Sequence, residues 1–95
     1  MILLDTNLLT RMTRSRDPLA GVARAAIQTL RRRGERLIIV PQNLYEFWTV
    51  ATRRAGAPPI GANGLGMTAI QAGHWVRFFR RRFELLPDRE EVSVI

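Results

Sequence analysis

Two carboxylates in this sequence could form a metal site if the fold brings them together. Asp5 ends an apolar run in the stretch MILLDTNLLTR, and Glu46 lies much further along the chain in the stretch VPQNLYEFWTVATR. Two carboxylates held close together repel each other unless a proton or a cation lies between them. Oxygen-rich acidic sites suit Mg²⁺ or Mn²⁺, and such ions bind phosphate and activate water. The pair therefore predicts metal-dependent chemistry at a phosphate group.

Each carboxylate also has a simpler explanation. Asp is common just before a turn or helix, so Asp5 could cap the helix that follows it. Glu46 could be a solvated helical carboxylate that pairs with Arg53 or Arg54 on the same helix. The sequence leaves both alternatives open.

A site built from these two acids needs elements that carry them to one edge of the fold. Short apolar runs predict strands buried on both faces of a parallel sheet. Apolar residues at helical spacing, preceded by capping residues such as Asp17 and Thr68, predict helices. The expected order is a strand at 2–4, a short helix from about 8, a helix at 18–33, a strand at 36–40, a helix from 41 to about 55, a Gly/Pro-rich loop at 57–67, a helix at 69–82 and a strand at 83–86. This order is typical of an α/β fold with a parallel sheet, where functional residues collect at the carboxyl ends of the strands.

The chain carries a large excess of positive charge. Its 15 basic residues are all Arg, against 8 acidic ones, which gives a formal net charge of +7. Arg binds phosphate through paired hydrogen bonds, so the excess favours RNA, DNA or an acidic protein as a partner. A general preference for Arg over Lys explains the absence of Lys equally well. Arg11, Arg14 and Arg16 follow Asp5 closely and are candidates for contact with an RNA phosphate.

Composition limits the domain count and the compartment. The 95 residues are expected to form a single domain, 1–95. The chain has no cysteine, which excludes disulfides and thiolate metal sites and favours a reducing cytoplasm. No apolar run approaches the roughly 18 residues of a membrane span, so no membrane partner is expected.

Several other residues are expected to be structural. Leu19, Val22, Trp48 and Trp75 fall on the apolar stripes of helices and are predicted to pack in the core. Basic residues 80–82 end a helix, where they offset the negative end of its dipole. These residues are expected near the sheet edge opposite Asp5, which weakens a role in binding RNA.

The two acidic motifs together resemble the PIN domain, and within it the VapC type of bacterial toxin ribonuclease. That family opens with an apolar strand ending in Asp-Thr-Asn or Asp-Thr-Ser, as residues 5–7 do here. It carries a Glu early in the helix after the second strand, in a context that Pro41, Leu44 and Glu46 match. The resemblance covers nearly the whole chain in its order of elements. It implies a three-layer α/β/α fold with a parallel sheet, here with the first three strands and their helices.

The resemblance also implies a function. It points to a metal-dependent endoribonuclease of a toxin–antitoxin system, which hydrolyses RNA phosphodiesters with Mg²⁺ or Mn²⁺. Asp5 and Glu46 would be the catalytic metal ligands, and Thr6 and Asn7 would orient the site by hydrogen bonding. RNA would be the substrate, an antitoxin protein would block the site, and the cytoplasmic protein would form a homodimer.

One part of the family pattern is missing. The family places a third metal-site Asp at the start of a helix beyond the third strand, and this sequence ends where that region would begin. Asp88, Glu90 and Glu91 follow the third strand too closely to match and are interpreted as solvated. We therefore expect the N-terminal two-thirds of a PIN domain, with its first strand at an exposed edge of the sheet. The departure supports an alternative function, a catalytically inactive truncated remnant that only binds antitoxin or RNA.

Overall fold

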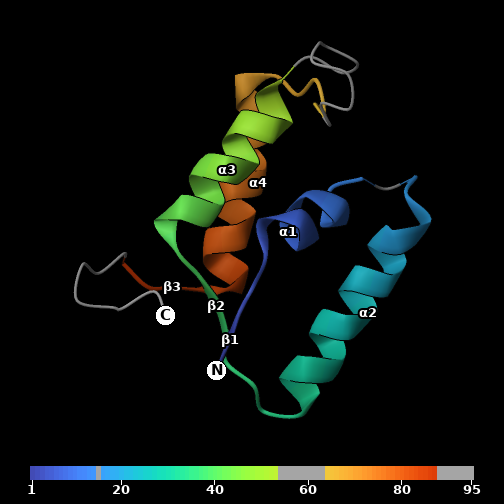
Figure 1. Cartoon of the computed structure of the whole chain (residues 1–95), viewed down its shortest axis with the longest axis vertical. Coiled ribbons are helices and arrows are strands. Elements are labelled where there is room, and N and C mark those ends of the chain that lie inside the picture. The colour runs from blue at the N-terminus through green and yellow to red at the C-terminus, as the bar shows by residue number, and fades with distance from the viewer. Residues whose placement is uncertain (15, 54–63, 88–95) are drawn as a thin grey trace.

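The computed structural model describes residues 1–14, 16–53 and 64–87 of the chain. Most of the predicted Gly/Pro-rich loop, and the acids Asp88, Glu90 and Glu91, lie outside these residues. The described elements follow the predicted order (Figure 1): β1 (Ile2–Leu3), α1 (Thr6–Met12), α2 (Pro18–Arg32), β2 (Leu37–Ile39), α3 (Pro41–Thr52), α4 (Ala69–Arg82) and β3 (Glu84–Leu85). The prediction of an α/β fold is confirmed at this level.

The three strands form a parallel sheet in the order β1-β2-β3. Ile2 pairs with Leu37 in β2, and Ile39 of β2 pairs with Leu85 in β3. β1 therefore lies at an edge of the sheet formed by the described residues, as expected. Just before β2, Arg36 binds the carboxylate of Glu84 in β3 through two nitrogens. This hydrogen bond raises the pKa of Arg36 above its ordinary value and ties the two strands together.

The helices begin where capping residues are found. Asp17 accepts a hydrogen bond from the amide of Leu19 at the start of α2, and Thr68 accepts one from the amide of Gln71 at the start of α4. α2 is followed by Gly34, whose φ of 80° suits glycine. Helix α1 begins at Thr6, earlier than the predicted start near residue 8, because Asp5 is its N-cap. Helix α3 ends at Thr52, before the predicted end at about residue 55.

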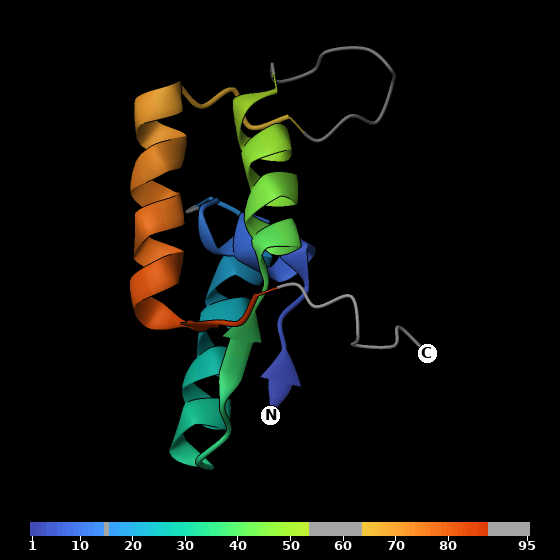
Figure 2. The same ribbon diagram turned by 90° about the vertical axis from the view of Figure 1, so that its left-hand side faces the viewer.

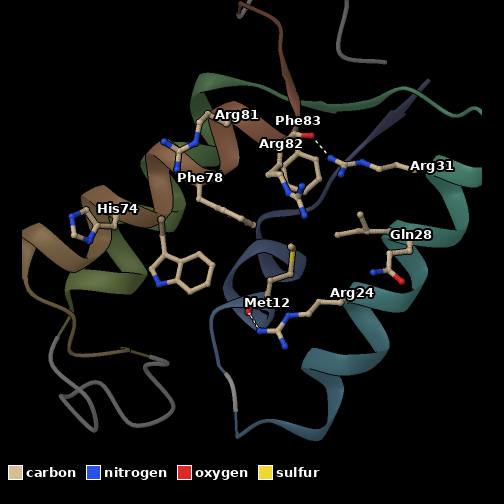
Figure 3. Close-up of a pocket in the computed structure, with 11 residues that line it drawn as sticks. Met12, Arg24, Gln28, Arg31, His74, Phe78, Arg81, Arg82 and Phe83 are labelled. Carbon is tan, nitrogen blue, oxygen red and sulfur yellow. Dashed lines mark hydrogen bonds between the residues drawn. The ribbon is translucent and has the colours of Figure 1, made fainter.

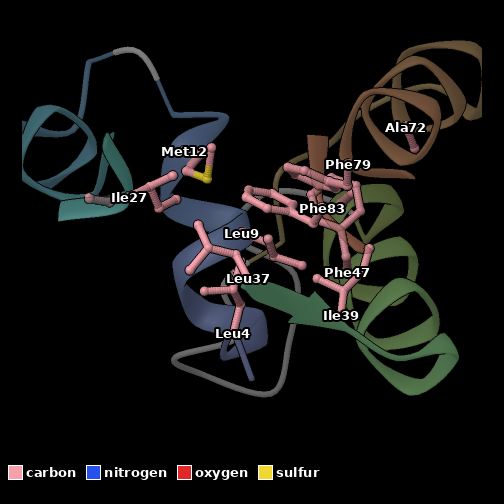
Figure 4. Close-up of a cluster of buried hydrophobic side chains, with 12 residues drawn as sticks. Leu4, Leu9, Met12, Ile27, Leu37, Ile39, Phe47, Ala72, Phe79 and Phe83 are labelled. Atoms are coloured by element: carbon pink, nitrogen blue, oxygen red, sulfur yellow. The ribbon is translucent and has the colours of Figure 1, made fainter. Parts of the chain in front are cut away.

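The helices cover the sheet from two sides, which is compatible with a three-layer α/β/α arrangement. Figure 1 shows α2 on one side of the strands and α3 with α4 on the other, while α1 packs against both α2 and α3. Turned by 90°, Figure 2 shows α3 and α4 side by side and running in opposite directions. The core lies between these layers (Figure 4), and its largest fully buried side chains are Phe47, Phe79, Leu9 and Ile39. The rings of Phe47 and Phe79 meet edge to face with centroids 4.9 Å apart, which fixes α3 against α4.

Some residues predicted to be buried are exposed. Val22 is 64% exposed, Leu19 is also exposed, and Trp48 is 39% exposed. In α2 the side chains that are buried are Ala20, Ala23 and Ile27. The apolar stripe of α2 is therefore wider than the surface that packs against it.

None of the helices in the described ranges combines the length and the apolar character needed to cross a membrane.

Candidate functional site

Asp5 stands between β1 and α1, at the carboxyl end of its strand. Its backbone is extended, and its Oδ1 accepts a hydrogen bond of 3.0 Å from the amide of Asn7. The capping alternative for Asp5 is therefore confirmed. It is compatible with a ligand role, because the cap uses one carboxylate oxygen and no hydrogen bond or ion pair within the described ranges uses the other.

Glu46 projects from the second turn of α3 and is held by two neutral donors. Its Oε2 accepts a 2.9 Å hydrogen bond from the hydroxyl of Thr6, and its Oε1 accepts one of 3.1 Å from the side-chain amide of Gln42. The alternative in which Glu46 pairs with Arg53 has no ion pair to support it in the part of the chain that the structure describes. Arg54 lies outside that part.

The buried side chain of Asn43 supports this arrangement through hydrogen bonds. Only 8% exposed, it donates from Nδ2 to the hydroxyl oxygen of Thr6 at 3.1 Å and to the carbonyl of Leu4 at 3.2 Å. Its Oδ1 accepts from the amide of Val40 at 2.8 Å. One side chain thus ties the end of β1, the end of β2 and the first turn of α3 together. A Thr hydroxyl has one proton, and because Asn43 donates to Thr6, that proton is directed to Glu46.

Asn43 was not among the site residues predicted from the sequence. A local signal was present, because Asn43 lies three residues after Val40 and two after Pro41, at a helix start. Asn at such a position often bonds the backbone before the helix. Its further bonds to Leu4 and Thr6 depend on how α3 packs against β1, which the sequence pattern does not specify.

The two carboxylates line one cavity of about 400 Å³ at the carboxyl edge of the sheet. Its other lining residues come from α1 and from α3 and its end: Thr6, Asn7, Gln42, Tyr45, Thr49, Val50 and Arg53. Arg53 brings a positive charge to the same cavity, and Tyr45 is 73% exposed beside it. Asn7 contributes to the site through its backbone amide, and within the described residues its side-chain amide has no hydrogen-bond partner.

The donor set fits a magnesium ion that keeps much of its water. Mg²⁺ is commonly bound by one or two carboxylates, with waters and substrate phosphates completing its shell. Asp5 and Glu46 provide two such carboxylates in one cavity. Among residues 1–14, 16–53 and 64–87, no group of three His, Cys, Asp or Glu side chains could hold a metal ion. An ion bound in this cavity would therefore have Asp5 and Glu46 as its two acidic ligands within the described residues.

The arginines in and after the last turn of α1 do not line this cavity. Arg11 lies in the last turn of α1, and Arg14 follows its C-cap, Thr13. A helix of seven residues is about 10 Å long, so these side chains start from the far end of α1 relative to Asp5. Arg14 and Arg16 line a second cavity of about 520 Å³ with Asp17. Their contact with an RNA phosphate remains a prediction.

Comparison with protein-family models, curated proteins and solved structures found no match to this chain.

Proposed function

We propose that this chain is a metal-dependent endoribonuclease similar to PIN-domain toxins of the VapC type. The observation that carries the proposal is that Asp5 and Glu46, far apart in sequence, line one cavity, and that Thr6, the residue after Asp5, donates a hydrogen bond to Glu46. In an α/β fold, ligands bind outside the carboxyl ends of the parallel strands, and this pair of carboxylates lies at that edge of the sheet. The order of the elements and the Asp-Thr-Asn motif support the PIN-like assignment.

Each residue has a role under this proposal. Asp5 and Glu46 hold the ion, while Thr6 donates a hydrogen bond that fixes the side chain of Glu46 and Asn43 orients the hydroxyl of Thr6. Bound Mg²⁺ or Mn²⁺ supplies Lewis acidity toward the phosphodiester and activates water. Arg53, in the same cavity, is placed to bind a phosphate oxygen of the RNA backbone.

The proposal extends to partners and location. RNA is the substrate, and an antitoxin protein inhibits the nuclease by covering the cavity. The active form is a homodimer in the cytoplasm. The positive net charge of the chain supports RNA as a partner, because Arg residues attract the phosphate backbone.

A second function is favoured by one observation. The described residues offer two carboxylates at the cavity and no third acidic or histidine ligand beside them. A chain with this set alone could bind RNA or antitoxin without cleaving RNA. Such binding would need no divalent metal, and RNA affinity would fall steeply with salt.

RNA cleavage with and without Mn²⁺ separates the two functions. The wild type is compared with Asp5→Asn, and Asp17→Asn is the matched control, because Asp17 also caps a helix through Oδ1 but lies outside the cavity. Asn is as good an N-cap as Asp, so both variants should fold. The nuclease proposal expects Mn²⁺-dependent cleavage that is lost in Asp5→Asn and retained in Asp17→Asn. Equal cleavage by the wild type and Asp5→Asn would exclude Asp5 as a metal ligand, whereas RNA binding without any cleavage would support the inactive remnant.

A further inference from the structure

A third cavity, here called the α2–α4 cavity, lies away from the acidic site. It has a volume of about 500 Å³, within the range of small-molecule pockets. Its apolar wall is formed by Met12 of α1, Ile27 of α2, Trp75 and Phe78 of α4, and Phe83 (Figure 3). Trp75 and Phe78 are half-buried and meet edge to face, with ring centroids 5.4 Å apart. The wall therefore presents partly exposed aromatic surface on which a planar ring can stack.

Four arginines line the same cavity. In Figure 3, Arg24 and Arg31 reach across from α2, while Arg81 and Arg82 come from α4. The guanidinium carbon of Arg31 lies 5.2 Å from the ring centroid of Phe83, and that of Arg82 lies 5.4 Å from the ring centroid of Phe78. Stacking on a ring holds a guanidinium in place while its N–H groups remain available to another partner.

Two of these arginines also neutralise helix ends. Arg24 donates to the carbonyl of Met12 at 2.7 Å, at the end of α1, and Arg31 donates to the carbonyl of Arg82, at the end of α4. Each of these bonds uses one of the five N–H groups of a guanidinium. A helix C-terminus carries about half a negative charge, so two ends offset about one of the four positive charges. No carboxylate in the described residues lines the cavity, and an excess of about three positive charges remains there.

Aromatic rings beside guanidinium groups suit a ligand with a planar ring and a phosphate. Bases stack on aromatic side chains, and the planar Arg fork matches two phosphate oxygens. Gln28 adds an amide at the wall that can both donate and accept a hydrogen bond. We propose that the α2–α4 cavity binds a nucleoside phosphate unit, with the base against Trp75 and Phe78 and the phosphate at Arg81 and Arg82.

This site is independent of the proposed nuclease function. The α2–α4 cavity and the cavity of Asp5 and Glu46 share no lining residue. The unit that binds could be a free nucleotide or one nucleotide of an RNA strand, since both carry a base and a phosphate. Binding needs no divalent metal in either case.

Binding can be followed through Trp75. The chain has two tryptophans, so Trp48→Phe leaves Trp75 as the sole reporter, and Trp48 is not part of the cavity wall. This protein is titrated in EDTA with AMP, adenosine, inorganic phosphate and a five-nucleotide RNA, and equilibrium dialysis measures the same affinities directly. We expect saturable binding of AMP that is at least about tenfold tighter than that of adenosine or phosphate. Tighter binding of the RNA than of AMP would identify a strand as the source, and equal binding would identify the free nucleotide.

A pair of matched double variants tests the location. Arg81→Gln with Arg82→Gln removes two charges from the cavity, and it spares the bond of Arg31, which is made to the backbone of Arg82. Arg32→Gln with Arg33→Gln removes the same charge at the end of α2, outside the cavity. We expect AMP affinity to fall about tenfold in the first variant and to stay within about twofold in the second. The proposal is overturned if AMP and the RNA show no saturable binding by fluorescence or dialysis. It is equally overturned if both double variants weaken binding to the same extent, since the attraction would then be diffuse.

Discussion

Replacing Thr6 with valine tests whether the Thr6 hydroxyl holds Glu46 at the candidate metal site. Thr6 is buried at the first position of α1, and its hydroxyl bridges Asn43 and Glu46. Valine keeps the shape of threonine and exchanges only the hydroxyl for a methyl group. The change therefore removes the bridge without creating a cavity.

The expected loss of stability follows from three contributions. A hydrogen bond to a charged group contributes about 1.5–3 kcal/mol, and the exposure of Glu46 places this bond at the lower end of that range. Asn43 loses one acceptor but keeps the carbonyl of Leu4, so little is added to the cost. Burying a methyl group returns up to about 0.8 kcal/mol. We expect Thr6→Val to lower the free energy of unfolding by about 0.7–1.5 kcal/mol.

Urea unfolding measures this loss, and a double-mutant cycle assigns it to the bond with Glu46. Thr49→Val is the matched control, because Thr49 lies on an exposed face of α3 and, within the described residues, its hydroxyl donates to the carbonyl of Tyr45 and to no side chain. The control should change stability by no more than about 0.5 kcal/mol. In a Glu46→Ala background, Thr6→Val should cost less than in the wild type, with a coupling energy of at least about 0.5 kcal/mol. If an ion is bound at the site, Thr6→Val should also weaken Mn²⁺ binding about 10- to 100-fold, as loss of a supporting partner does in other metal sites.

Two results would refute this reasoning. Thr6→Val could be as stable as the wild type, which would mean that water replaces the hydroxyl at no cost. Alternatively, the effects of Thr6→Val and Glu46→Ala could add within about 0.3 kcal/mol, which would mean that the two side chains do not interact. A change in the denaturant slope of either variant would point instead to an altered denatured state.

Three further predictions concern stability. Asn43→Ala should cost about 2–4 kcal/mol in urea unfolding, because it leaves the partly buried amide of Val40 and the buried carbonyl of Leu4 without their partner. Phe79→Ala should cost about 3–5 kcal/mol, because Phe79 is fully buried against α3, whereas Val22→Ser should change stability by no more than about 0.5 kcal/mol, because Val22 is largely exposed. Mn²⁺ at a hundredfold excess over its dissociation constant should stabilise the wild type by about 2.7 kcal/mol in thermal unfolding, and EDTA should reverse this gain.

The helices could be predicted from sequence because their start signals are local. The pair Asp17 and Pro18, and the reciprocal bonds of Thr68 and Gln71, require only residues within one turn of each other. The burial of individual side chains was predicted less well, because it depends on which element packs against the helix. Helical spacing shows that Val22 and Ile27 belong to one apolar stripe, but α1 has only seven residues and α2 has fifteen, so part of the stripe finds no cover in the described fold.

The position of Asp5 and Glu46 in one cavity could be predicted, because parallel strands place their carboxyl ends at the same edge of the sheet whatever the details of packing. The network beneath it could not, since the bond between Asn43 and Thr6 depends on the position of α3 against β1. The cap made by Asp5 would not prevent this residue from binding a metal ion. The cap holds Oδ1 through the amide of Asn7, which orients the carboxylate and leaves the charge and the other oxygen available to a cation. Because asparagine can make the same cap without the charge, Asp5→Asn should keep the stability of the apo protein within about 0.5 kcal/mol and lose the stabilisation by Mn²⁺. Loss of stability without added metal would instead mean that the carboxylate at position 5 is needed mainly for the fold.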